Sequence, residues 1–120
     1  MRLASYLRYS SDNQDEFSIE GQREENQKYA DRNGHTIVVE YIDRAQSGTK
    51  DDRKDFLRMM ADSKTDLFDG ILVYKLNRFS RDRYDSAYYK RELKKLGIRV
   101  LSATEYITDT PEGRNIRSGT

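Results

Sequence analysis

Three separate segments of the chain carry arginines in patterns that suit chemistry on an anion. In YLRYSSDNQ (6–14), Arg8 lies two residues before Ser10. Arg53 follows the polar stretch DRAQSGTKDD (43–52), and KLNRFSRD (75–82) contains Arg78 and Arg81. A guanidinium donates hydrogen bonds in a planar fork that matches two oxygens of a phosphate. These residue types therefore predict an oxyanion site beside a serine hydroxyl.

The kind of oxyanion follows from the residues around the serine. Acyl-transferring serines normally need a histidine or lysine base, and no Gly-x-Ser-x-Gly motif occurs in the chain. Several arginines around a serine suit a phosphodiester instead, because their charge offsets the charge that develops in a pentacovalent transition state. The same positive charge favours the ionised form of the serine hydroxyl.

Composition excludes several other kinds of site. The chain has no cysteine, which excludes disulfides and thiolate zinc sites, and His35 alone would have to carry any histidine-based metal site or catalytic triad. Because arginines can supply the charge, we expect no metal and no cofactor. The net charge of +1 does not predict a nucleic-acid binder, but residues 75–83 hold four basic residues against Asp82 alone. Such a short basic loop can bind phosphate locally.

Alternating strands and helices are predicted to position these segments. We expect strands at 2–7, 36–42, 70–74 and 98–103, with 104–107 adding a short fifth. We expect helices from an N-cap at Ser18 to about 33, from about 52 to 63, and from about 82 to 96. This order predicts an α/β fold with three αβα layers around a mostly parallel sheet of four to five strands.

In an open sheet of this kind, ligands bind beyond the carboxyl ends of the strands. The first strand delivers Arg8 and Ser10 to that edge, and the second delivers Asp43 and then Arg53. The third delivers Lys75, Asn77, Arg78 and Arg81. The arginines and the hydroxyl are therefore expected to meet at one edge of the sheet.

The chain of 120 residues has the length of a single domain. No apolar run approaches the length needed to span a membrane, and the N-terminus reads as a strand rather than a signal peptide. We therefore expect a soluble, cytoplasmic protein without a membrane partner.

Five segments together resemble the catalytic domain of serine site-specific recombinases, the group of resolvases, invertases and large serine integrases. They are YLRYSSDNQ, FSIEGQREE, YIDRAQSGT, DDRKDF and DGILVYKLNRFSRD, which occur in the family's order, and the resemblance as a whole covers about residues 3 to 113. The resemblance implies a resolvase-like fold. It also implies that Ser10 attacks a DNA phosphodiester, forming a 5′-phosphoserine linkage and freeing a 3′-hydroxyl. Strand exchange and reversal of that step would rejoin the DNA without ATP or metal.

The resemblance also implies a role for each matching residue. Ser10 is the nucleophile, and the scissile phosphate is bound and neutralised by Arg8, Arg53, Arg78 and Arg81. Gln22 and Asp43 match positions that orient the arginines or the serine. Arg78 is a candidate to protonate the leaving 3′-oxygen. The chain departs from the family at Asn77, where many members have aspartate, and at Tyr9, where a small aliphatic residue is common.

The resemblance further implies a domain organisation and partners. In this family a long dimerisation helix and a DNA-binding domain follow the TPEG segment, whereas IRSGT (116–120) does not resemble the start of an amphipathic helix. We therefore expect a catalytic domain at 1–113, truncated before those parts, and a tail at 114–120. DNA is the expected partner. The full-length protein is expected to form dimers or tetramers, and this fragment to be monomeric or weakly associating.

Other readings of the same residues remain open. The chain could be a phosphate-ester hydrolase on a similar sheet, or a non-catalytic assembly module that keeps the fold. Ser11 is expected to be an ordinary turn residue, and His35 a surface residue. Tyr6, Tyr41 and Tyr74 are expected in the core rather than as nucleophiles. Asp69 begins its strand about 20 Å from the site, so a structural role at the far edge of the sheet is expected.

Overall fold

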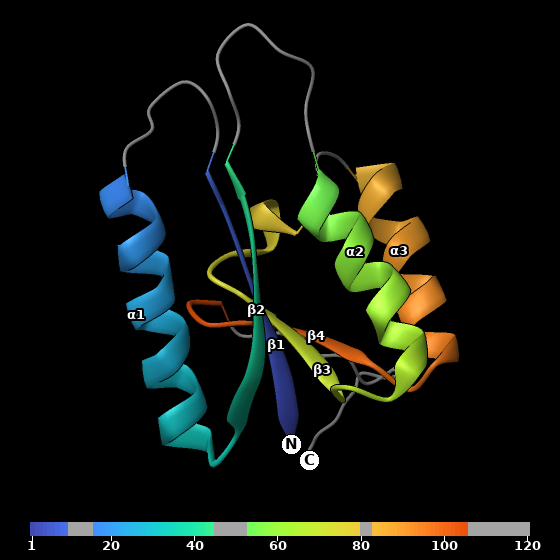
Figure 1. Ribbon diagram of the computed structural model, residues 1–120, viewed down its shortest axis with the longest axis horizontal. Coiled ribbons are helices and arrows are strands. Elements are labelled where there is room, and N and C mark those ends of the chain that lie inside the picture. Colours follow the sequence, from blue (N-terminus) through green and yellow to red (C-terminus); the bar gives the residue numbers. More distant parts are fainter. Residues whose placement is uncertain (10–15, 45–52, 80–82, 106–120) are drawn as a thin grey trace, which may run out of the picture.

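A computed structural model describes residues 1–9, 16–44, 53–79 and 83–105 (Figure 1). Its strands are β1 (Arg2–Tyr9), β2 (Thr36–Arg44), β3 (Gly70–Val73) and β4 (Arg99–Ser102). Its helices are α1 (Glu16–Asn33), α2 (Lys54–Asp62) and α3 (Arg83–Lys95), with the short 3₁₀ helices η1 (Ser63–Thr65) and η2 (Leu76–Arg78). No helix within these described ranges is long and apolar enough to cross a membrane.

The sheet has the order β2-β1-β3-β4, and every neighbouring pair is parallel. The chain moves outward from β1 to β2 and then returns across the sheet to β3 and β4. Because crossovers between parallel strands are right-handed, this reversal places α1 on one face and α2 and α3 on the other, as Figure 1 shows. The predicted αβα architecture is confirmed, with four parallel strands. The reversal makes the carboxyl ends of β1 and β3 a topological switch point, where ligands bind in such folds.

Burial in the sheet follows strand position. Central β1 and β3 are covered on both faces, so Leu3, Leu7 and all four residues of β3 are buried. Edge strand β2 has only Tyr41 and Asp43 buried. Tyr6 and Tyr41 lie in the core as predicted, whereas Tyr74 is half-buried just beyond β3.

An aromatic cluster centred on Phe56 joins the elements near the carboxyl edge of the sheet. The Phe56 ring lies edge-to-face with Tyr6, Phe79 and Tyr89, at centroid distances of 5.5, 5.3 and 4.9 Å. Such arrangements stabilise aromatic pairs beyond the area that they bury. The cluster therefore fixes α2, α3 and the end of η2 against β1.

Several predicted boundaries need correction. Helix α1 begins at Glu16, so Ser18 lies inside the helix and is not its N-cap. No glycine or proline interrupts 16–19, and an acid in the first turn favours an earlier start. Strands β1 and β2 run two residues further than predicted because Arg8 pairs with Asp43 and Tyr9 with Arg44.

The predicted ends of the third and fourth strands also differ from the structure. β3 ends at Val73 because the chain bends there into η2, and β4 covers only Arg99–Ser102. Of the predicted fifth strand, 104–105 form a bend and 106–107 lie outside the described residues.

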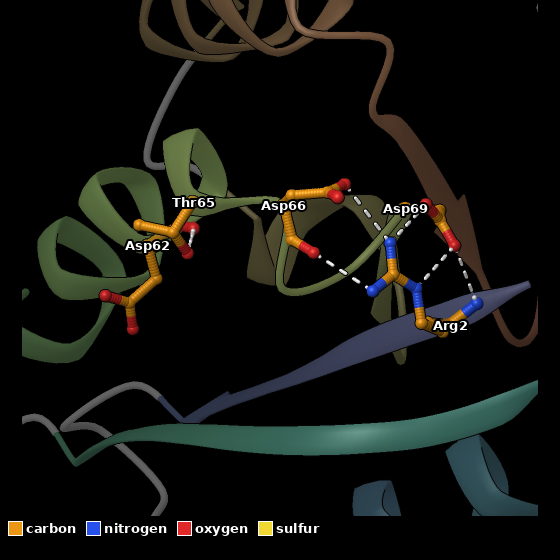
Figure 2. A network of polar contacts seen from close by, with 5 residues as sticks. All are labelled: Arg2, Asp62, Thr65, Asp66 and Asp69. Carbon is orange, nitrogen blue, oxygen red and sulfur yellow. Dashed lines mark hydrogen bonds and ion pairs between the residues drawn. The ribbon is translucent and has the colours of Figure 1, made fainter.

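The opposite edge of the sheet is held by an ion-pair network around Arg2 (Figure 2). The Arg2 guanidinium donates to both carboxylate oxygens of Asp69, at 3.1 and 3.0 Å, and to the Asp66 carbonyl at 3.0 Å. The backbone N–H of Arg2 donates to Asp69 as well, at 3.1 Å. These bonds from Arg2 lower the pKa of Asp69 to about 2. The structural role predicted for Asp69 is confirmed. His35, near the same edge, is partly exposed and contacts the N-terminal amine at 3.1 Å.

Candidate functional site

The end of β1 is held by a two-point contact with α1. The Gln22 side-chain oxygen accepts a hydrogen bond from the Arg8 backbone N–H at 3.3 Å, and its amide nitrogen donates to the Arg8 carbonyl at 2.9 Å. Gln22 is only 2% exposed, so water cannot substitute for this contact. The contact fixes the backbone two residues before Ser10. Ser10 itself lies outside the described residues.

Asp43 joins the end of β2 to the start of α2. One carboxylate oxygen accepts from the Asp55 N–H at 2.9 Å, and the other accepts from the Phe56 N–H at 2.9 Å and the Tyr6 hydroxyl at 2.8 Å. Amides in the first turn of a helix have no partner within the helix, and the positive end of its dipole favours a carboxylate. Asp43 therefore places the helix start, and with it Arg53, through the backbone.

The Tyr6 hydroxyl at the centre of this joint is protonated over a wide pH range. Burial raises its pKa, and the neighbouring Asp43 carboxylate raises it further. The charges of Arg8 and Arg53 act in the opposite direction on the same phenol.

The Arg53 guanidinium is enclosed by aromatic rings and a carboxylate. Its central carbon lies 4.3 Å from the centroid of the Phe56 ring and 5.5 Å from that of Tyr89. Its Nη1 donates to Asp85 at 2.8 Å, and the side chain is 12% exposed. Its Nη2 is buried and has no hydrogen-bond partner among the described residues. A buried cationic donor without a partner is costly, so this atom is suited to receive an anion.

Arg78 lies on η2, directly after β3, and contacts Arg8. The Arg8 Nε donates to the Arg78 carbonyl at 3.3 Å. Burial lowers the pKa of Arg78, and the positive charge of Arg8 lowers it further. The buried Nε of Arg78, like Arg53 Nη2, lacks a partner within the described part of the chain. Two adjacent like charges with a spare buried donor would be stabilised by an anion.

A polar network around Glu105 holds the start of η2. The Glu105 carboxylate accepts from the Leu76 N–H at 2.8 Å and from the Ser102 hydroxyl at 3.0 Å. The Leu76 contact lowers the pKa of Glu105. Lys75 is directed toward Thr104, with 3.3 Å between its Nζ and the Thr104 hydroxyl. Glu105 therefore fixes the start of the short helix that carries Arg78.

The structure brings together five of the seven residues predicted for the site. They are Arg8, Gln22, Asp43, Arg53 and Arg78. Ser10 and Arg81 lie outside the described residues, and the Asn77 side chain is not described. Sequence reasoning did not identify Asp85, Tyr89 and Glu105 as neighbours of the site. Their contacts join segments about 30 residues apart, and no local pattern signals them. No cluster of histidine, cysteine, aspartate and glutamate that could hold a metal ion occurs among the described residues.

Comparisons with known proteins agree with the fold. The chain matches the family model for the resolvase N-terminal domain over residues 3–118. The N-terminal catalytic domain of TP901-1 integrase is 32% identical, with a TM-score of 0.78, and the match covers 94% of this chain and 85% of that domain. A resolvase family site-specific recombinase from Streptococcus pneumoniae is also 32% identical, with a TM-score of 0.77 and coverage of 86% and 72%.

A more distant structure shares the fold. The C-terminal catalytic domain of ISC1926 TnpA, an IS607-like serine recombinase, is 24% identical with a TM-score of 0.74, covering 88% of this chain and 69% of that one. No curated protein sequence gives a significant match. The family match spans nearly the whole chain and agrees with the parallel sheet. The chain therefore belongs to the resolvase N-terminal domain family and is a serine recombinase catalytic domain.

Proposed function

We propose that Ser10 attacks a DNA phosphodiester whose charge is neutralised by Arg8, Arg53, Arg78 and Arg81. The observation that supports this most directly is the position of three arginines near the carboxyl edge of the sheet. Arg8 donates to the Arg78 carbonyl, and Arg53 precedes the helix whose first turn is bound by Asp43. Two of them, Arg53 and Arg78, each keep a buried donor atom without a partner among the described residues. A phosphate carries the charge and the acceptor oxygens that these donors lack.

In the proposed reaction the Ser10 oxygen forms a bond to phosphorus as the bond from phosphorus to the 3′-oxygen breaks. The products are a 5′-phosphoserine linkage and a free 3′-hydroxyl, and attack by a 3′-hydroxyl on the phosphoserine reverses the step. Arginines preorganised around the phosphate stabilise the charge of the transition state without reorganisation at the moment of reaction. Gln22 positions Arg8, and Asp43 positions Arg53, each through backbone contacts.

Arg78 is the proposed donor of a proton to the leaving 3′-oxygen. Its lowered pKa supports this role, because a guanidinium that loses its proton more readily than usual is a stronger acid. Burial is the larger cause of the lowering, and the adjacent Arg8 charge adds to it.

Covalent trapping tests the proposal. The recombinase is offered a labelled DNA duplex that carries its recombination site, and the products are separated under denaturing conditions. We expect a protein–DNA adduct whose linkage maps to Ser10, and no adduct with Ser10→Ala. Ser11→Ala is the matched control, and it should retain the adduct. An adduct that persists in Ser10→Ala would refute the assignment.

The two alternatives predict different results. A phosphate-ester hydrolase would turn over a small aryl phosphate in a manner that depends on Ser10, and a non-catalytic assembly module would give no adduct in the wild type. Family membership favours the recombinase over the hydrolase. The arginines of the described site favour a catalytically active domain over a non-catalytic assembly module.

We propose DNA as the substrate and dimers or tetramers as the working form of the full-length protein, with weak or no association of these 120 residues alone. The division into a catalytic unit at 1–113 and a tail at 114–120 stays a prediction.

A further inference from the structure

We propose that Asp85, on α3, is a positioning residue that fixes the orientation of Arg53 for phosphate binding. The inference rests on the proposed function, because it assigns a role to Asp85 through Arg53. It deepens that function by making α3, which carries none of the predicted site residues, part of the site.

The contacts of Arg53 constrain its guanidinium in two independent ways. The Phe56 ring lies against the guanidinium, with 4.3 Å between the central carbon and the ring centroid, and bounds the group on one side. The 2.8 Å ion pair between Nη1 and Asp85 holds one end of the group. Together these contacts limit the directions that Nη2 can take, and Nη2 is the buried atom without a partner among the described residues.

This arrangement differs from an ordinary surface ion pair. The Arg53 and Asp85 side chains are 12% and 22% exposed, whereas the Lys95–Glu92 pair on the same helix is 66% and 38% exposed. Exposed pairs contribute little because water screens them and the side chains must be ordered. A largely buried guanidinium already held in one orientation loses less freedom when it binds a phosphate.

A carboxylate beside a phosphate site also repels the phosphate. Electrostatics alone therefore predicts that replacing Asp85 by a neutral residue should strengthen phosphate binding. A positioning role predicts weaker phosphate binding instead, because the Arg53 guanidinium would lose its fixed direction. The sign of the change in affinity separates the two roles.

The test follows arginine Nε–Hε signals by NMR during titration with inorganic phosphate. In the wild type we expect phosphate to shift the signals of Arg53 and Arg78. In Asp85→Asn we expect binding about five- to tenfold weaker, despite the loss of a negative charge. Glu92→Gln, which removes a charge from the same helix away from Arg53, should leave the affinity unchanged or slightly increased. Asp85→Glu should restore part of the lost affinity.

A measurement on the wild type keeps the proposal falsifiable if Asp85→Asn does not fold. Rotation about the Nε–Cζ bond of Arg53 should be slow, and that of exposed Arg32 fast. Free rotation of Arg53, or phosphate binding in Asp85→Asn as tight as in the wild type, would overturn the inference. If Arg53→Gln leaves the phosphate response intact, the proposed phosphate site itself is wrong. If Arg53→Gln abolishes the response while Asp85→Asn does not weaken it, only the role of Asp85 is wrong.

Discussion

The described contacts of Gln22 and Asp43 act on the arginines through the backbone. Gln22 bonds both backbone groups of Arg8, and Asp43 bonds the first amides of the helix that follows Arg53. A neutral amide suits the first position, because it offers one donor and one acceptor to a backbone that needs both. A carboxylate suits the second, because three donors converge on it. Their residue types therefore follow from the groups that they satisfy.

Replacing Gln22 by alanine is expected to lower the free energy of unfolding by about 1–3 kcal/mol. The reason is that the N–H and carbonyl of Arg8 lose their buried partner. Urea unfolding measures the change. Gln27→Ala is the matched control on the same helix, since Gln27 is exposed and bonds only Asp31 among the described contacts, at 3.0 Å. The control should shift stability by less than about 0.5 kcal/mol. Equal effects of the two substitutions would contradict the role given to Gln22.

The sequence predicts some residues of the candidate site and not others. Arg8, Arg53 and Arg78 stand out because guanidiniums near strand ends suggest anion chemistry, and the family resemblance adds Gln22 and Asp43. Asp85 and Glu105 have no such signal. Each is one acid among many on a charged chain, and its importance arises from its contact with a distant segment. The spacing of residues along the chain does not indicate tertiary contacts of this kind.

Of the described glycines, Gly70 at the start of β3 has the least room for a side chain. A Cβ at Gly70 would lie 2.9 Å from Cδ2 of Leu3, 3.1 Å from the Met1 sulfur and 3.3 Å from the Arg99 carbonyl. Leu3 is completely buried, so its side chain has little room to move. Glycine at this position therefore lets β1, β3 and β4 approach closely at the amino edge of the sheet.

Gly70→Ala and Gly21→Ala should change stability in opposite directions. The first is expected to cost about 1–3 kcal/mol, because overpacking forces the neighbours of Gly70 apart. The second should stabilise the protein by about 0.5–1 kcal/mol, because Gly21 lies within α1, where an added Cβ meets nothing within 4 Å. Thermal unfolding of both variants compares them directly. A neutral Gly70→Ala would mean that the strands adjust more easily than the contacts suggest.

The elements show which part of the fold is visible in the sequence. Apolar runs and glycine signals predict the order of strands and helices correctly, because each run must be buried in its own layer. Element ends are less predictable. β1 and β2 extend to Tyr9 and Arg44 because each supplies the other's hydrogen bonds, which depends on pairing across the sheet. The sequence places the start of α1 at Ser18, because serine is a favourable N-cap residue. In the structure this serine lies within a segment that is already helical.

The two edges of the sheet differ in how their charged side chains are paired. The carboxyl edge carries cationic side chains with buried donor atoms. This arrangement favours ligand binding over stability. At the amino edge, Arg2 is paired with Asp66 and Asp69, which joins β1 to the segment between α2 and β3 (Figure 2). Arg2 at the amino edge is thus paired within the chain, whereas Arg53 Nη2 and Arg78 Nε at the other edge have no partner among the described residues. This division follows from parallel strands, which put all their carboxyl ends on one side.

The amino edge makes stability depend on acid pH. The pKa of Asp69 is about 2 in the folded protein and ordinarily 3.8, so the folded state favours its ionised form. A lowered pKa contributes stability above the unfolded value, and that contribution is lost as pH falls from about 4 to 2. We therefore expect Asp69→Asn to destabilise the protein at pH 7, and the difference from wild type to shrink across this range.

Urea unfolding of the wild type and Asp69→Asn between pH 2 and 7 measures this dependence. Asp31→Asn serves as the control, because Asp31 is exposed on α1 and bonds a neutral glutamine rather than an arginine. Its difference from wild type should stay small throughout. If the Asp69→Asn difference is the same at pH 2.5 as at pH 7, the contact stabilises through shape and hydrogen-bond geometry rather than through charge. The ionised Arg2–Asp69 pair would then not be what holds this edge of the sheet.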